Sequence, residues 1–242
     1  MENAREKTAA VVLAAGKGKR MNSDIPKQYM MLREKPVIYY ALKAFEDSFI
    51  DEIILVTEQG EEAYCREEIV ERYHFTKVRK IVPGGAERYF SVANGLEAVS
   101  EDCAYIFIHD GARPFVTEEI LQTALETVRV HHACVAAMPV KDTIKKVDEN
   151  GKVEDTPPRK SLYTVQTPQA FSYSLIYDSY QKMIADGRED VTDDAMVVEA
   201  YGKVPVYVID GSYRNFKITT PEDLEMAEFM LNAGNPGKGV CS

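Results

Sequence analysis

Short apolar runs alternate along this chain with longer segments of helical periodicity, and this alternation limits the possible folds more than any other feature. The apolar runs are rich in β-branched residues and cover residues 9–13, 53–57, 78–82, 105–109, 133–138 and 204–209. The helical segments cover residues 37–46, 61–73, 89–98, 118–130, 174–185 and 221–231. Several runs are hydrophobic almost without interruption, which is typical of parallel strands buried on both faces. We therefore predict an α/β fold with a single doubly wound, mostly parallel sheet.

One stretch of the chain, residues 139–171, carries no helical pattern. Its first part, KDTIKKVDENGKV, predicts two short strands that turn at Asn150-Gly151. Because an isolated hairpin cannot bury itself, we expect residues 139–171 to form a protruding β-arm that packs on another subunit. A long flexible flap is the alternative. Residues 1–242 are expected to form a single domain, from which the arm projects.

Composition and charge argue against several classes of protein. The chain has 242 residues, 45% of them hydrophobic, which is ordinary for one folded domain. Its formal net charge of −10 argues against general binding to nucleic acid or to anionic membranes. No apolar run reaches the length of a membrane span, and the first residues lack the layout of a signal peptide, so a cytoplasmic location is expected. Cys65, Cys103, Cys134 and Cys241 lack metal-site spacing and are interpreted as buried free thiols.

The segment after the first apolar run, residues 13–29, combines small residues with positive charge in the sequence LAAGKGKRMNSDIPKQY. Small residues at the carboxyl end of a strand let backbone N–H groups approach phosphate oxygens closely. The small residues are Ala14, Ala15, Gly16 and Gly18, and the cations are Lys17, Lys19, Arg20 and Lys27. In an acidic chain, these cations predict a site for a dense polyanion such as a triphosphate. A solvated basic loop is the alternative.

Polar residues follow three later apolar runs as well. Gly85 and Ser91 come after residues 78–82, Asp110 and Arg113 come after residues 105–109, and Lys217 comes after residues 204–209. Each alone is compatible with an ordinary turn or surface position. Because ligands bind beyond the carboxyl ends of the strands in open α/β sheets, we expect these side chains to share one cleft. Asp110, beside a phosphate site, is then a natural Mg²⁺ ligand.

Several familiar functional patterns are absent from the sequence. The G-x-x-x-x-G-K-[ST] phosphate loop does not occur, and Met21 occupies the third glycine position of the dinucleotide fingerprint. We find no Ser-His-Asp or Cys-His constellation, and His109 is interpreted as a packed, hydrogen-bonded residue.

Seven motifs occur in a characteristic order between about residue 12 and about residue 231. They are AAGKGKRM-x5-KQY, GGAER-x2-SV-x2-GL, HDGARPF, KDTIK, PRKSLYTVQTPQAF, VTDDA and NFKITTPEDL. In these motifs the chain resembles the 2-C-methyl-D-erythritol 4-phosphate cytidylyltransferases of the non-mevalonate isoprenoid pathway. Gly111 stands where many members of that family have alanine, and we expect this departure to be harmless.

The resemblance implies a Rossmann-like nucleotidyltransferase that transfers CMP from CTP to 2-C-methyl-D-erythritol 4-phosphate and releases pyrophosphate. It implies Mg²⁺ or another divalent cation, and a homodimer built through the arm. The residues implied for CTP are Ala14, Ala15, Gly16, Gly18, Arg20, Lys27, Gly85, Ser91 and Asp110. Those implied for the polyol phosphate are Asp110, Arg113, Thr143, Arg159, Thr167, Thr192 and Lys217. The resemblance gives catalytic roles to Arg20, Lys27, Arg159 and Lys217 and the metal to Asp110, with Thr143 and Arg159 reaching the partner's site.

Three other functions are weighed against this one. A pentitol-phosphate (ribitol 5-phosphate) cytidylyltransferase shares the first loop and the TPQ and KITTP segments, but HDGARP and KDTIK are closer to the isoprenoid enzyme. A non-catalytic nucleotide-binding regulator would not need Arg20, Lys27 and Asp110 together. Met21 argues against an NAD-dependent dehydrogenase.

Overall fold

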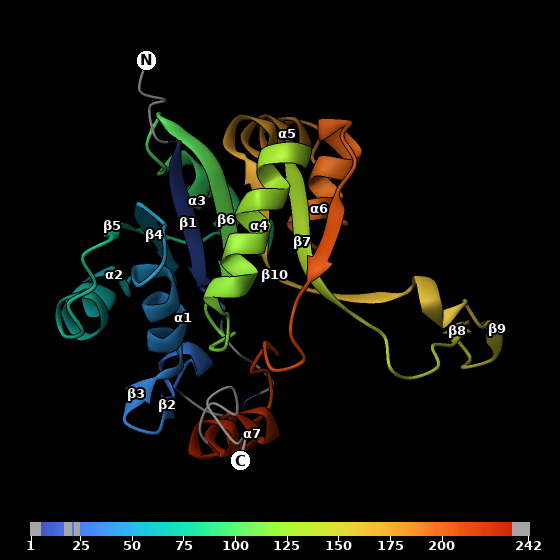
Figure 1. Ribbon diagram of the computed structural model, residues 1–242, viewed down its shortest axis with the longest axis horizontal. Coiled ribbons are helices and arrows are strands. Elements are labelled where there is room, and N and C mark those ends of the chain that lie inside the picture. Colours follow the sequence, from blue (N-terminus) through green and yellow to red (C-terminus); the bar gives the residue numbers. More distant parts are fainter. Residues whose placement is uncertain (1–5, 17–20, 22–24, 234–242) are drawn as a thin grey trace, which may run out of the picture.

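The computed structural model of the protein describes residues 6–16, 21 and 25–233. Within those residues the largest sheet has seven strands in the order β11-β7-β10-β6-β1-β4-β5 (Figure 1). The strands are β1 (Lys7–Ala14), β4 (Glu52–Thr57), β5 (Val78–Pro83), β6 (Cys103–Asp110), β7 (Ala133–Pro139), β10 (Tyr163–Ser172) and β11 (Tyr207–Asp210). All neighbouring pairs are parallel except that β10 runs antiparallel to both β6 and β7. The predicted α/β fold with a mostly parallel sheet is confirmed.

Helices cover both faces of this sheet. The helices are α1 (Val37–Glu46), α3 (Arg88–Glu97), α4 (Glu118–His131) and α5 (Tyr173–Ala185). Along β1, Ala10 and Val12 belong to the core cluster under α1 and α4, whereas Ala9 and Val11 belong to the cluster under α3 and α5. Successive side chains of a strand point to opposite faces, so burial on both sides requires the continuous apolar run seen in the sequence. No helix in the described ranges is long and apolar enough to cross a membrane.

Shorter elements complete the domain. They are the hairpin of β2 (Met31–Leu32) and β3 (Lys35–Pro36), α2 (Glu62–Tyr64) with the π-helical segment Cys65–Glu71, α6 (Asp194–Val197) with the π-helical segment Val198–Gly202, and α7 (Pro221–Asn232). Thr220 and Asp223 form a capping box at the start of α7, with Pro221 in its first turn. This arrangement satisfies backbone donors that the first helical turn leaves free. Helix α7 packs with Leu32 and Ile218 in a small separate cluster.

The position of β10 corrects the boundary expected for the arm. The predicted arm of residues 139–171 includes residues 163–171, but these belong to β10, which lies in the interior of the sheet. A proline within an apolar run argues against a central strand because it donates no hydrogen bond to the ladder. Here the pairing of β10 with β7 breaks between Val165 and Gln169, so that Pro168 occupies the irregularity. The Thr167-Pro168 peptide bond is cis.

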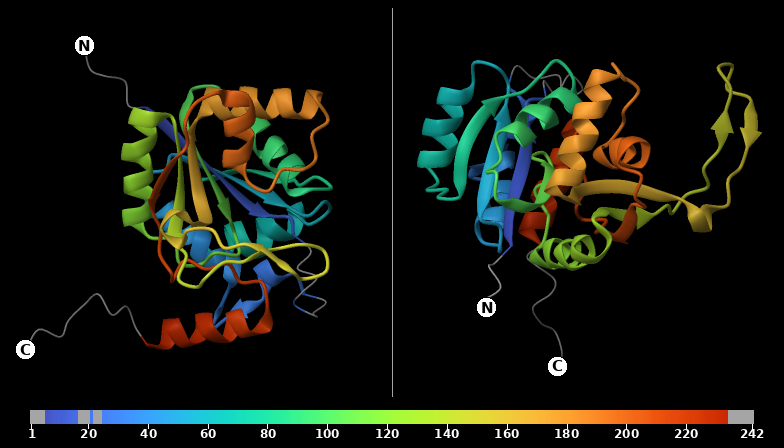
Figure 2. Two further views of the ribbon diagram at one scale, coloured as in Figure 1. Left: turned by 90° about the vertical axis from the view of Figure 1, so that its right-hand side faces the viewer. Right: turned by 90° about the horizontal axis from the view of Figure 1, so that it is seen from above.

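Residues 140–162, called the arm from here on, extend away from the body of the domain (Figure 2). Their tip is the antiparallel hairpin of β8 (Lys146–Val147) and β9 (Val153–Asp155), which places the turn at Asn150-Gly151 as predicted. Val147 and Val153 are about half exposed, at 50% and 51%. The arm therefore presents apolar side chains to its surroundings, with no sheet of its own large enough to cover them.

The described cysteines agree with the expectation of buried free thiols. Cys65, Cys103 and Cys134 are buried and free, and burial raises the pKa of Cys103 and of Cys134 to about 12. Thiols held in this protonated state are poor nucleophiles and metal ligands. Cys241 lies outside the described residues.

Candidate active site

A cleft of about 520 Å³ lies at the carboxyl ends of β1, β4 and β6. This volume falls within the range typical of small-molecule sites. The sequence-predicted residues that line it are Ala14, Ala15, Gly16, Lys27, Gly85, Ser91, Asp110 and Lys217. These residues come from five separate segments of the chain, which the sheet brings together at the carboxyl ends of its parallel strands. We call this cavity the first compartment.

The loop after β5 lies close against the loop after β1. A Cβ atom on Gly84 would lie 2.4 Å from Ala15 Cβ and 2.8 Å from Ser91 Oγ, so only glycine fits at position 84 without a shift of its neighbours. The backbone N–H of Gly85 donates to Ser91 Oγ at 3.0 Å, which links this loop to the first turn of α3. The close approach at Gly84 therefore places Gly85 beside the loop that follows β1, and Gly85 lines the first compartment.

Two side chains next to Lys27 hold its segment against the sheet. Gln28 is buried and its Nε2 donates to the backbone oxygen of Ala14 at 2.5 Å. The Tyr29 hydroxyl lies 2.8 Å from Thr57 Oγ1 and donates to Glu61 Oε2 at 2.9 Å. These contacts join the short 3₁₀ turn Lys27–Tyr29 to the ends of β1 and β4. The turn is thereby placed so that Lys27 lines the cleft.

A second compartment of about 370 Å³ adjoins the first. Its lining includes Arg113, Thr167 and Thr192, which are three of the residues predicted to surround a polyol phosphate. Arg88, Asp110 and Lys217 line both compartments and form the wall between them. Two ligands, one in each compartment, would therefore meet at these three side chains.

The carboxylate of Asp110 is surrounded by positive charge. Lys217 Nζ lies 2.9 Å from Oδ2, Arg113 Nε lies 3.6 Å from the same oxygen, and Arg88 Nε lies 3.6 Å from Oδ1. Burial by itself would raise the pKa of Asp110, but the charges of Lys217, Arg88 and Arg113 outweigh it and hold this pKa well below its usual value. Asp110 is therefore ionised at neutral pH.

His109 supports Asp110 without entering the cleft. Its Nε2 lies 3.1 Å from the backbone oxygen of Arg113, and its Nδ1 lies 3.1 Å from Thr167 Oγ1. Because a carbonyl oxygen only accepts, Nε2 carries the proton and Nδ1 accepts from the Thr167 hydroxyl. That hydroxyl oxygen in turn accepts from the Asp110 backbone N–H at 3.0 Å.

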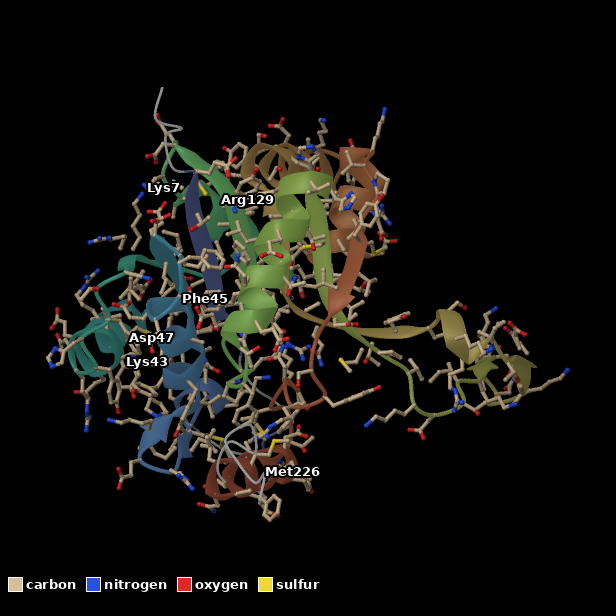
Figure 3. All side chains as sticks on the ribbon, viewed as in Figure 1. Lys7, Lys43, Phe45, Asp47, Arg129 and Met226 are labelled. Atoms are coloured by element: carbon tan, nitrogen blue, oxygen red, sulfur yellow. The ribbon has the colours of Figure 1, made fainter. Side chains whose placement is uncertain are left out.

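The environment of His109 keeps its ring neutral. Complete burial lowers the pKa of His109 to about 4. Phe45, which comes from α1 (Figure 3), contacts the imidazole edge-to-face with ring centroids 5.2 Å apart. His109 is therefore a packed residue that holds the end of β6, as interpreted from the sequence.

Two of the predicted residues, Thr143 and Arg159, line neither compartment of their own chain. Both are exposed on the arm, where the Arg159 guanidinium donates to the backbone oxygen of Lys141 at 2.7 Å. The structure therefore does not bring them to the other site residues within one chain. Gly18 and Arg20 lie outside the described residues, as do Lys17 and Lys19.

Sequence reasoning missed other residues of the site. Arg88 stands at the wall between the compartments, Gln28 lines the first compartment, and Gln166 and Gln169 line the second. The sequence did contain a signal for Arg88, because this residue lies in the GGAER motif, directly before a predicted helix. Gln166 and Gln169 do not follow any predicted strand. They belong to β10, which the sequence did not predict, so their position beside the second compartment could not be predicted either.

Comparison with known proteins supports the family inferred from the motifs. Residues 8–233 match the family described as "IspD: 2-C-methyl-D-erythritol 4-phosphate cytidylyltransferase". The chain belongs to this family. A relative of that name from Lachnospira eligens is 52% identical over 224 residues, which cover 92% of this chain and 98% of the relative. A relative of the same name from Lachnoclostridium phytofermentans is 47% identical over 226 residues, or 93% of this chain and 97% of the relative.

Solved structures of cytidylyltransferases in this family share the fold. The 4-diphosphocytidyl-2C-methyl-D-erythritol synthase from Anaerococcus prevotii superposes with a TM-score of 0.83 at 35% identity, over 94% of this chain and 96% of that one. The 2-C-methyl-D-erythritol 4-phosphate cytidylyltransferase from Thermus thermophilus superposes with a TM-score of 0.75 at 30% identity, over 92% and 98% of the two chains. The resemblance stated from the motifs is confirmed.

Proposed function

We propose that this chain transfers CMP from CTP to 2-C-methyl-D-erythritol 4-phosphate, giving 4-diphosphocytidyl-2-C-methyl-D-erythritol and pyrophosphate. The observation that carries the proposal is the pair of adjoining compartments with a charged wall in common. One compartment has the glycine-lined, lysine-bearing character of a nucleotide site. The other offers arginine, lysine and threonine side chains to a smaller phosphorylated molecule.

In this proposal the first compartment holds CTP. The triphosphate would bind beside Ala15, Gly16 and Lys27, which line this compartment, as expected of a strand-end phosphate site. Ser91 and Gly85 line the same compartment, and the cytidine would bind beside them. Arg20 and Gly18, which lie outside the described residues, are proposed to act on the triphosphate as well.

The second compartment would hold the polyol phosphate. Arg113 Nη1 donates to the Asn215 backbone oxygen at 2.9 Å, and its buried Nε faces Asp110 Oδ2 at 3.6 Å, so two contacts fix its guanidinium. A planar guanidinium held at the lining of this compartment is suited to a phosphate oxygen. Thr167 and Thr192 supply further polar groups at this compartment.

The chemistry needs positioning and charge neutralisation more than it needs a base. A phosphate monoester has a second pKa of about 6, so the attacking phosphate is largely dianionic at neutral pH. One of its oxygens bonds to the α-phosphorus of CTP, and the bond from that phosphorus to the bridging oxygen breaks, leaving pyrophosphate with the electron pair. Lys27 and Lys217 would offset the negative charge that the two reactants bring together.

Asp110 at the wall is the proposed protein ligand of a bound Mg²⁺. Asp110 offers one ionised carboxylate, and the described part of the chain contains no cluster of three or more acidic, histidine or cysteine side chains that would form a complete protein cage. Mg²⁺ characteristically binds one or two carboxylates together with substrate phosphates and water. When bound beside Asp110, the ion would supply additional positive charge to the phosphates of CTP.

We further propose that the enzyme is a homodimer in which the arm completes the partner's site. The exposed Val147 and Val153 at the arm's tip would be buried against a second copy. Thr143 and Arg159 would then reach the partner's second compartment, since they line neither the first nor the second compartment of their own chain. Because CTP and the polyol phosphate are charged and do not cross membranes freely, a cytoplasmic enzyme is proposed.

A pyrophosphate-release assay over a grid of substrates tests the proposed function. CTP, UTP and ATP would each be combined with 2-C-methyl-D-erythritol 4-phosphate and with ribitol 5-phosphate, in the presence of Mg²⁺. Turnover is expected chiefly for CTP with the methylerythritol phosphate. A preference for ribitol 5-phosphate would assign the alternative activity, and CTP binding without turnover in any combination would remove the enzyme assignment.

A further inference from the structure

Three side chains line both compartments, and one of them has no role in the reaction proposed above. Asp110 and Lys217 were expected at the site, whereas Arg88 was not. Arg88 is the first residue of α3 and follows the tight turn at Gly84 and Gly85. Arg88 lies at the wall where the two anionic ligands are proposed to meet, so the role of its guanidinium needs an explanation.

The outer nitrogens of Arg88 are already engaged by the protein. Nη1 donates to Asp194 Oδ1 at 2.8 Å and Nη2 donates to Asp194 Oδ2 at 2.7 Å, which is a two-point contact. Asp194 is completely buried at the start of α6, and its Oδ1 also accepts from the Tyr180 hydroxyl at 2.6 Å. The plane of the Arg88 guanidinium is therefore held by Asp194 of α6, which is itself held by Tyr180 of α5.

Stability alone gives a poor account of this arrangement. Two charged groups lose the free energy of hydration when they are buried, and their mutual attraction often does no more than offset this loss. A buried ion pair is therefore weak evidence for a stabilising role. Its geometry, however, is specific, because only a planar fork satisfies both carboxylate oxygens at once. The pair of Arg88 and Asp194 is suited to placing a third group rather than to strengthening the core.

The third group is the carboxylate of Asp110. Arg88 Nε faces Oδ1 at 3.6 Å, whereas Lys217 and Arg113 both approach Oδ2. Positively charged groups approach the two oxygens from different directions, so they resist rotation of the carboxylate about the Cβ–Cγ bond of Asp110. The chain of contacts thus runs from Tyr180 and Asp194 through Arg88 to Asp110.

We propose that Arg88 is a positioning residue: clamped by Asp194, it holds the Asp110 carboxylate in the orientation that the meeting of the two phosphates requires. The inference rests on the proposed function, because it assumes that two phosphorylated ligands meet at this wall. Arg88 acts through Asp110, since both of its outer nitrogens are bonded to Asp194 and do not point at a substrate.

Two substitutions test this role from opposite ends of the contact. Arg88→Lys keeps the charge but loses the fork, and Asp194→Asn keeps the shape of the clamp but removes its charge. For both variants kcat is expected to fall on the order of 10- to 100-fold, the scale of a slightly misplaced catalytic group. The dissociation constant for CTP, measured by calorimetry without the polyol phosphate, is expected to change less than about threefold, within about 0.7 kcal/mol. The calorimetric stoichiometry gives the number of folded sites, and kcat is expressed per such site.

The double variant and a matched control separate positioning from general damage. Arg88→Lys combined with Asp194→Asn is expected to lose no more kcat than the worse single variant, because the two residues act as one unit. Arg188→Lys is the control, since Arg188 contacts Asp190 through two nitrogens at 2.6 and 3.3 Å but lines neither compartment. It is expected to keep normal kcat.

The possible outcomes are distinct. An unchanged kcat per site in Arg88→Lys or in Asp194→Asn would overturn the proposal, as would a loss of CTP affinity by the same factor as kcat. If Arg88→Lys does not fold, Asp194→Asn decides the question by the same two measurements. Failure of the unmodified enzyme to release pyrophosphate from CTP and the methylerythritol phosphate would instead refute the proposed function.

Discussion

Lys217 Nζ lies 2.9 Å from Asp110 Oδ2, although the two residues come from the loop before α7 and from the end of β6. This contact joins two segments that the sequence separates widely. It also explains why an acidic protein keeps a cluster of cations at one edge of its sheet, since Arg88 and Arg113 approach the same carboxylate. The positive charge of the wall is balanced in part by Asp110 and, at Arg88, by Asp194.

Replacement of Lys27 by alanine is expected to lower kcat by about 10²-fold or more, because it removes a charge-stabilising donor from the phosphate site. Steady-state pyrophosphate release would measure the effect. Lys182→Ala is a suitable control, since Lys182 is exposed on α5 and does not line the cleft. A Lys27→Ala variant with nearly normal kcat would contradict the role proposed for this lysine.

Arg159→Ala is expected to lower kcat/KM for the polyol phosphate while leaving the affinity for CTP unchanged. Arg159 lies on the arm, away from the first compartment of its own chain. Titration of CTP by calorimetry and kinetics at varied polyol phosphate would give the two quantities separately. Weaker CTP binding, with unaltered use of the polyol phosphate, would show that this arginine serves the nucleotide.

Mixed dimers test whether the arm completes the partner's site. In a 1:1 mixture of Arg159→Ala and Lys217→Ala chains, half of the dimers are mixed, and each of these has one site free of both changes. Activity of about a quarter of the wild-type value is therefore expected to return. Lys27→Ala mixed with Lys217→Ala is the control and should recover nothing, because both residues belong to the cleft of one chain. Equal activity in the two mixtures would rule out a composite site.

Gly111→Ala is expected to destabilise this protein by about 1–3 kcal/mol, the usual range for overpacking. A Cβ atom at residue 111 would lie 2.2 Å from Ile38 Cδ1 and 3.0 Å from the Leu13 backbone oxygen. Ile38→Val removes that methyl group, so the double variant should be more stable than the sum of the single effects allows. Urea unfolding would measure this coupling, and strict additivity would show that Ile38 is not the obstacle.

Stability at low pH should depend on Asp223. Burial alone would raise the pKa of this carboxylate, but hydrogen bonds from Thr219 and Thr220 outweigh burial and hold it below its usual value. A lowered pKa in the folded state means stabilisation that is present at neutral pH and lost as the pH falls through the folded value. The difference in unfolding free energy between wild type and Asp223→Asn should therefore shrink below about pH 4. An equal difference at pH 7 and pH 3.5 would contradict this expectation.

The sequence by itself determined the parallel strands of the sheet, because strands buried on both faces must be continuously apolar, as β1 and β6 are. It also indicated that Asp110, Lys27 and Lys217 follow strand ends, and the parallel arrangement brings such ends to one edge. The strand β10 escaped detection, because Pro168 and the glutamines beside it carry no strand pattern. Only the tertiary structure placed β10 between β6 and β7.

The tertiary structure alone decided the contacts at the wall between the compartments. The pairing of Arg88 with Asp194 joins the start of α3 to the start of α6, and no periodicity in the sequence encodes a contact between two such distant residues. The direction of a side chain at a loop or helix end depends on packing against other segments, whereas the alternation within a strand depends only on its neighbours in sequence. For this reason the strand ends could be predicted from the sequence, while the clamp on Asp110 became visible only in three dimensions.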